Sequence, residues 1–141
     1  MGKTFVKMRP DPGTGEMQAV RIPEHLDVIA ELACGAQAHF GLSQVSGFGD
    51  SFGITLFGSQ GTLQFTDGRL FGGQLGDHGL AEITIPPHEQ GGWRVEEEFI
   101  NAIRGQEKIR YTTFEDGLKY MQFTEAVTRS IQEGRSIALP L

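Results

Sequence analysis

The chain has 141 residues, 38% of them hydrophobic and 21% charged, which is the composition of a globular domain and not of a disordered or membrane protein. Its net charge of −6 would repel phosphate backbones, so nucleic acid is not an expected partner. Because the chain has one cysteine, Cys34, no apolar leader and no run approaching the ~20 apolar residues that cross a membrane, we expect a cytoplasmic protein without a membrane partner.

Short strands joined by turns are predicted for the first half of the chain. The 20 glycines of the whole chain favour this pattern, because glycine adopts the positive-φ conformations that tight turns need. A strand at about residues 3–8 is expected to enter a polar loop that runs to about Pro23. Apolar residues then alternate over 28–40, which indicates strand, and Cys34-Gly35 marks the turn of a hairpin.

The alternation of apolar residues continues further along the chain. Residues 52–56 alternate again, and the turn Gly58–Gly61 leads into the next strand. Asp67-Gly68 is a strong two-residue hairpin signal. A glycine-rich loop is predicted over Gly72–Gly79, before a last strand of the sheet that ends near residue 85.

Two helices are predicted after Pro87, where the hydrophobic period changes from two to about 3.6. They cover about residues 92–104 and 114–133. Thr113 and Asp116 are close to a capping box at the start of the second helix. Gly134 then ends that helix.

The sequence therefore predicts one α+β domain over residues 1–141. It has an open, mostly antiparallel sheet of about six to seven strands at about 3–85, with the two C-terminal helices packed on one face. A final short strand is expected at 136–139. The other face of the sheet carries apolar residues such as Val6 and Ile29, so we expect a homodimer or docking on another domain to cover it.

The recurrent catalytic and binding motifs point to no site. Gly47–Gly53 has nearly the spacing of a dinucleotide-binding turn, but a strand and not a helix is predicted after it, so it is interpreted as a turn. His39 is interpreted as a sheet-face residue, and Cys34 as an unreactive thiol. No histidine has a partner at the spacing of recurrent metal sites. No catalytic, cofactor-binding or metal-binding residue is assigned.

Four segments carry a family resemblance. They are the two helical regions Trp93–Gly105 and Thr113–Gly117, the segment Thr124–Ser130, and Gly58–Leu63 upstream. In their order and spacing they resemble the C-terminal sheet domain of the Gfo/Idh/MocA oxidoreductases, the family of glucose-fructose oxidoreductase and inositol dehydrogenase. The resemblance covers the chain from about residue 3 to its end.

The resemblance implies a larger parent protein. Its N-terminal Rossmann domain would bind NAD or NADP, and the sheet domain would shape a sugar or polyol site and form oligomer contacts. This chain lacks the Rossmann half and the family's Glu-Lys-Pro motif; Glu107-Lys108 is followed by Ile109. It also lacks the family's Asp-x-x-x-His pair. We therefore carry over no catalytic residue and expect no cofactor on this chain.

Two interpretations of the function follow. In the first, the chain is the substrate-side and oligomerisation domain of an NAD(P)-dependent sugar or polyol oxidoreductase, inactive alone, and its start at Met1 is the boundary of a fragment. In the second, it is a free-standing, non-catalytic binding or assembly module that uses the same sheet. Substrate contacts are assigned only weakly, to Arg9, Arg21 and His25 in the polar loop, where loop solvation is the alternative.

Overall fold

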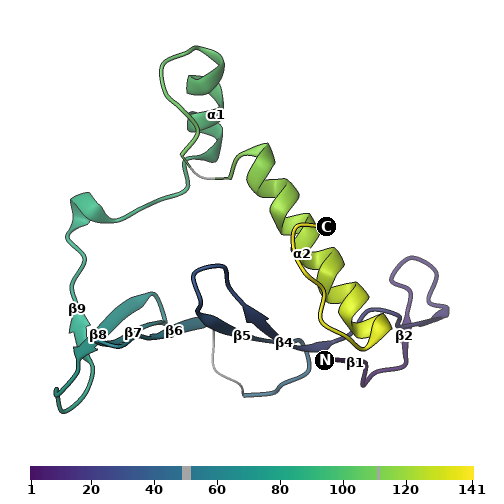
Figure 1. Cartoon of the computed structure of the whole chain (residues 1–141). Helices are drawn as coiled ribbons and strands as arrows, with labels where there is room; N and C mark the ends of the chain where they lie inside the picture. The colour runs from purple at the N-terminus through teal and green to yellow at the C-terminus, as the bar shows by residue number, and fades with distance from the viewer. Residues whose placement is uncertain (49–51, 111) are drawn as a thin grey trace. The chain divides into compact units, whose positions relative to one another are not determined.

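The computed structural model describes residues 1–48, 52–110 and 112–141 (Figure 1). Within these residues the chain forms nine strands in three antiparallel sheets and two α-helices, so the predicted α+β class is confirmed with more strands than expected. The chain divides into two compact units, and each is described by itself: Met1–Ser46 with Val95–Leu141, and Gly47–Arg94. A single domain over the whole chain stays a prediction.

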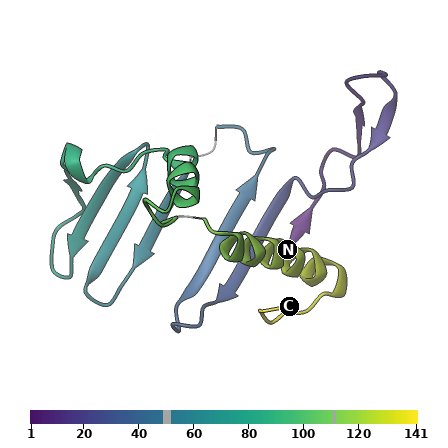
Figure 2. The ribbon, with the colours of Figure 1, turned by 90° about the horizontal axis from the view of Figure 1, so that it is seen from above.

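The main sheet of the first unit has the strand order β1-β4-β5. β1 spans Gly2–Lys3, β4 spans His25–Glu31, and β5 spans Gln37–Ser43 (Figure 2). The predicted hairpin turn is confirmed, because β4 and β5 pair antiparallel on either side of Gly35, which has a φ of 85°. That left-handed conformation favours glycine.

A second hairpin lies between β1 and β4 in the chain. β2 (Met8–Pro10) pairs with β3 (Met17–Ala19) as a separate two-stranded sheet. Its turn is built by the carboxylate of Asp11, whose Oδ1 accepts the backbone N–H groups of Gly13 and Thr14 at 2.9 and 3.0 Å. Such an Asx turn redirects the chain without a hydrophobic signal.

This hairpin corrects two predictions for the N-terminal region. A strand was predicted over residues 3–8, but the strands lie at 2–3 and 8–10, and residues 4–7 between them are not extended in a ladder. The polar loop predicted to run to Pro23 contains β3. The reason is that three-residue strands are too short for the apolar alternation to be read from the sequence.

The second unit is a four-stranded sheet of order β6-β7-β8-β9. Its strands are β6 (Gly53–Phe57), β7 (Gly61–Thr66), β8 (Arg69–Gln74) and β9 (Ala81–Ile83). The predicted Asp67-Gly68 hairpin is confirmed: both residues have positive φ, 50° and 74°, as a type I′ turn requires.

The glycine-rich loop predicted over Gly72–Gly79 begins later, because residues 72–74 belong to β8. Gly73 serves a close backbone approach and not a turn. A Cβ added to Gly73 would lie 2.9 Å from the carbonyl oxygen of Gly79, where the following loop returns over the strand. Glycine in a strand commonly marks such an approach.

The helices follow their predicted positions. α1 spans Val95–Ile103 and α2 spans Phe114–Glu133, after a short 3₁₀ turn, η1, at Pro87–Glu89. The capping box is confirmed: Thr113 Oγ1 accepts the N–H of Asp116 at 3.2 Å, and the carboxylate of Asp116 accepts the N–H of Thr113 at 3.1 Å. Gly134 ends α2 with a φ of 65°.

The final strand predicted over 136–139 is wrong, because these residues form no ladder with any described strand. A short alternation of apolar and small residues cannot by itself create a strand, which needs a neighbouring edge with which to pair.

α2 packs on one face of the β1-β4-β5 sheet (Figure 2). The rings of Phe40 and Phe123 lie 5.5 Å apart between their centroids, and a Cβ added to Gly2 would lie 2.7 Å from Cδ1 of Ile131. Ala126, on the same side of the helix, is buried. The small core of the first unit therefore lies between α2 and this face.

Candidate functional site on the open face of the first sheet

The face of the first sheet opposite α2 is predominantly polar. Side chains alternate between the two faces of a strand. Phe40 points toward α2, so every second residue of β5 counted from Phe40, with its partner on β4, points the same way. The residues between them point away. The residues that point away are His25, Asp27, Ile29 and Glu31 on β4 and Gln37, His39, Gly41 and Ser43 on β5. Ile29, which was predicted to lie on this face, is 72% exposed, and its neighbours on the face are polar.

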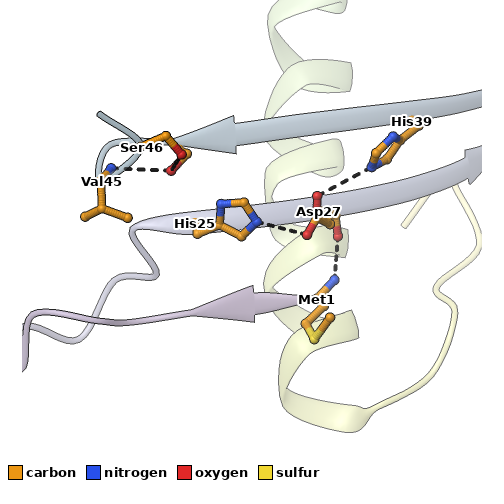
Figure 3. A network of polar contacts seen from close by, with 7 residues as sticks. Met1, His25, Asp27, His39, Val45 and Ser46 are labelled. Carbon is orange, nitrogen blue, oxygen red and sulfur yellow. Dashed lines mark hydrogen bonds and ion pairs between the residues drawn. The ribbon is translucent and has the colours of Figure 1, made fainter. Parts of the chain in front are cut away.

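Asp27 joins two histidines on this face. Nε2 of His25 lies 2.9 Å from Oδ2 of Asp27, and Nε2 of His39 lies 3.4 Å from Oδ1 of the same carboxylate (Figure 3). The three side chains are 35% exposed for His25, 39% for Asp27 and 65% for His39, so a dissolved molecule can reach them. The prediction that His39 is a sheet-face residue agrees with this position.

The electrostatics of this cluster keep Asp27 ionised. The hydrogen bond with His25 lowers the pKa of Asp27 most; the charge of a protonated His25 and the hydrogen bond with His39 lower it further, against partial burial. A carboxylate accepts and does not donate, so Nε2 of His25 carries the proton that points to it. In the neutral ring, Nδ1 of His25 is then a hydrogen-bond acceptor.

A hollow of about 440 Å³ lies beside His25. It is lined by Phe5, His25, Ser43, Val45 and Ser46. Ser46 Oγ donates to Ser43 Oγ at 2.9 Å, and the rings of Phe5 and His25 meet edge to face with centroids 6.4 Å apart. One imidazole, two hydroxyls and an aromatic ring can bind a small hydroxyl-bearing molecule through hydrogen bonds and ring contact.

The three residues predicted to contact a substrate lie in different surroundings. His25 lines the hollow. Arg9 forms an ion pair with Glu24, whose carboxylate also accepts the N–H groups of Phe5 and Val6 at 3.0 and 2.7 Å. Arg21 is exposed in the segment between β3 and β4 and is not among the residues that line the hollow.

Asp27 and Ser43 were not selected from the sequence as site residues, although a signal for them existed. A hairpin turning at Cys34-Gly35 places Ser43 opposite His25, and His39 opposite Ile29, one step from Asp27 along the same face. The predicted turn therefore determines the register, and with it the polar residues that meet across the two strands.

The absence of a dinucleotide-binding site from this chain stays a prediction. Such a site needs a glycine-rich turn between a strand and a helix N-terminus. Of the Gly47–Gly53 pattern, residues 49–51 lie outside the described residues, and Gly53 begins strand β6, as predicted. No group of three metal-binding side chains occurs in the part of the chain that the structure describes, and none of its helices is long and apolar enough to span a membrane.

No protein-family model matches the chain, and no curated protein matches it. Its function is therefore inferred from the residues described above and from the resemblance that their sequence carries.

Proposed function

We propose that this chain is the C-terminal, substrate-side and oligomerisation domain of an NAD(P)-dependent sugar or polyol oxidoreductase, and that it is inactive alone. Within this proposal the parent is cytoplasmic, and the domain that binds NAD or NADP is a separate Rossmann half. The main support comes from the second unit, whose sheet has one apolar face although none of the unit's described residues is buried.

This apolar face is formed by cross-strand neighbours of the second sheet. They are Phe52, Ile54, Leu56, Leu63, Phe65, Leu70 and Ile83. None of the described residues of the unit Gly47–Arg94 is buried, and Leu56 is 60% exposed. A sheet with one apolar face becomes stable when a second layer covers that face. The unit therefore has the surface of a domain that works against a partner.

The opposite polarity of the first sheet supports a substrate-side role. Its open face offers Nδ1 of His25 as an acceptor and the hydroxyls of Ser43 and Ser46 beside a hollow of about 440 Å³. These groups can position the hydroxyls of a polyol. Within the proposal, this chain contributes substrate contacts and leaves the redox step to the Rossmann half that binds the dinucleotide.

Cofactor titration tests the proposal directly. Trp93 is 80% exposed, so its fluorescence can report NADH or NADPH at the surface of the purified chain. We expect no saturable change, and the same titration of a free tryptophan analogue corrects for absorbance by the cofactor. Saturation at micromolar cofactor would show that this chain carries a nucleotide site of its own and would refute its role as a detached half.

Self-association is the second part of the proposal. The apolar face of the second sheet would pack against the same face of another copy, as in an isologous dimer. In sedimentation velocity we expect a dimer whose Kd rises about tenfold or more in Leu56→Ser. Thr55→Ala, on the other face of β6, is the matched control and should leave Kd unchanged. A wild-type chain that stays monomeric at all concentrations contradicts this part.

The alternative, a free-standing assembly module, shares the apolar face but not the parent. The coding sequence upstream of this chain separates the two. A segment encoding Gly-x-Gly-x-x-Gly in the same reading frame supports the oxidoreductase, whereas an independent start without it supports the assembly module.

A further inference from the structure

The hollow beside His25 has a fixed pattern of hydrogen-bond donors and acceptors. Three of the side chains that line it are polar, namely His25, Ser43 and Ser46, and each already makes at least one hydrogen bond within the protein. The donors and acceptors that these contacts leave over determine what a bound molecule has to offer.

Ser43 is left as a hydrogen-bond donor. Its Oγ accepts the O–H of Ser46 at 2.9 Å and the N–H of Val45 at 3.3 Å. A hydroxyl oxygen has two lone pairs, and these two contacts use both. The group that Ser43 can offer to a ligand is therefore its own O–H.

Ser46 and His25 are left as acceptors. Ser46 donates its O–H to Ser43, which leaves the lone pairs of its oxygen. His25 donates Nε2–H to Asp27, so its neutral ring presents Nδ1 as an acceptor. The hollow therefore offers two acceptors together with the one donor from Ser43.

A pair of hydroxyls matches this pattern better than an ion does. An ionised carboxylate only accepts and a protonated amine only donates, so each would face at least one group of its own kind, whereas a hydroxyl does both. The Oγ atoms of Ser43 and Ser46 are 2.9 Å apart. Two ligand oxygens that bind them must also be close neighbours, as they are on adjacent carbon atoms.

The charges beside the hollow have opposite signs. Lys3 lies opposite His25 in the sheet, and its ammonium lies 5.0 Å from the centre of the Phe5 ring. Asp27, two residues from His25 on the same face, is ionised, as described above. The fields of one cation and one anion oppose each other, so the surroundings do not favour a ligand of either charge.

We propose that this hollow recognises a neutral vicinal diol. One hydroxyl donates to Nδ1 of His25 and accepts the O–H of Ser43, and the neighbouring hydroxyl donates to Oγ of Ser46. Phe5 and Val45, which also line the hollow, contact the C–H groups of the ligand. This inference rests on the proposed function and deepens it, because it names the substrate class as neutral sugars and polyols rather than their acids or amines.

The test is a titration of the ¹⁵N-labelled chain, followed by the amide NMR shifts of residues 43–46 at about pH 8, where a neutral imidazole is favoured. The probes are the cis vicinal diol of cyclohexane and cyclohexanol, which has the same ring and one hydroxyl. The Kd of the diol should be lower by about fivefold or more, because the second hydroxyl adds a hydrogen bond. The cis vicinal hydroxy acid of the same ring should bind more weakly than the diol.

A variant of Ser46 tests the predicted contact itself. Ser46→Ala removes the acceptor for the second hydroxyl, so it should bind the diol and cyclohexanol with Kd values within about twofold of each other. Ser136→Ala, at an exposed serine of the C-terminal segment, is the matched control and should keep the wild-type preference. A general loosening of the hollow would weaken binding of both alcohols together.

Each outcome decides for or against the diol site. Equal Kd values for the two alcohols in the wild type, tighter binding of the hydroxy acid, or no saturable shift with any probe overturns it. A preference that persists in Ser46→Ala overturns it as well, and if that variant does not fold, the wild-type comparison decides. None of these results changes the NADH titration or the sedimentation experiment, so the proposed function can fail while the diol still binds.

Discussion

The buried carboxylate of Glu24 accepts the backbone N–H of Val6 at 2.7 Å, across 18 residues of sequence. The same carboxylate binds the N–H of Phe5 and pairs with Arg9, so one side chain fixes the segment between β1 and β2. That segment has no ladder of its own. The position of this segment therefore depends on the side chain of Glu24, which lies directly before β4.

Glu24→Gln should loosen this segment. The amide keeps one acceptor oxygen but loses the charge that strengthens the hydrogen bonds and attracts Arg9. We expect a lower melting temperature and faster hydrogen exchange at the amides of Phe5 and Val6. Glu31→Gln, at the exposed end of β4, is the control and should change neither. Unchanged exchange at Val6 in Glu24→Gln would mean that the charge has no role.

The same residue should make stability depend on pH. The hydrogen bond from the N–H of Val6 lowers the pKa of Glu24 most, followed by the N–H of Phe5 and the charge of Arg9, against desolvation. A carboxyl with a lowered folded-state pKa stabilises the fold above its unfolded pKa of about 4.3, and this is lost as pH falls through the folded value. The melting temperature of the wild type should therefore fall more steeply than that of Glu24→Gln between about pH 5 and pH 3.

The capping box at the start of α2 should contribute measurably to the free energy of unfolding. Thr113→Ala removes the hydroxyl that accepts the N–H of Asp116, leaving that helix donor without its cap. We expect the free energy of unfolding to fall by about 1 kcal/mol in urea titrations. Thr124→Ala, on the exposed side of α2, is the control and should change it by less than about 0.5 kcal/mol. Equal effects of the two variants would show that the cap adds nothing.

Substitution of Gly61 tests whether the second unit needs glycine where its strands pack closely. A Cβ at Gly61 would lie 2.3 Å from the carbonyl oxygen of Gly73, so the β7–β8 ladder would have to shift. Gly61→Ala should destabilise the unit by about 1–3 kcal/mol, measured by hydrogen exchange of residues 53–83. At Gly79 an added Cβ meets nothing within 4 Å, so Gly79→Ala should leave exchange unchanged. A mild effect of Gly61→Ala would mean that the ladder yields easily.

Local signals predicted the parts of the fold that local chemistry determines. The turns at Cys34-Gly35 and Asp67-Gly68 and the cap at Thr113 each depend on a few neighbouring residues, and each is confirmed. The β2–β3 hairpin was missed because its strands have three residues each and its turn depends on the carboxylate of Asp11, so neither shows a hydrophobic pattern. Gly72 and Gly73 were placed in a loop because the sequence does not distinguish a glycine needed for a turn from one needed because other atoms pack closely against the strand.

The candidate site was predictable only in part, for a different physical reason. His25 was selected as a residue of the polar loop, but it is the first residue of β4. Its partner Asp27 lies on the same strand, and His39 lies on β5. The hairpin register puts these three side chains on one face. Whether that face stays open depends on the packing of α2, through contacts such as that between Phe40 and Phe123. The alternation of apolar residues in the sequence separates the two faces of the sheet but does not predict which face α2 covers.

Asp27→Asn should change the state of the His25 ring. The ionised carboxylate of Asp27 selects the neutral tautomer of His25 with its proton on Nε2, and leaves Nδ1 as the acceptor beside the hollow. An amide can turn either its oxygen or its nitrogen toward the ring, so that selection is weakened. In ¹⁵N-resolved NMR spectra of the deprotonated ring we expect one tautomer in the wild type and a mixture in Asp27→Asn.

Ser43→Ala is the control for this experiment. Ser43 lines the same hollow, but its hydroxyl is bonded to Ser46 and to the N–H of Val45, so the variant should keep the wild-type tautomer of His25. If the wild type already shows a mixture, Asp27 does not orient the ring, and His25 cannot present a defined acceptor to a substrate hydroxyl. If the ring keeps one tautomer in Asp27→Asn, a different contact selects it, and the role assigned to this carboxylate would pass to that group.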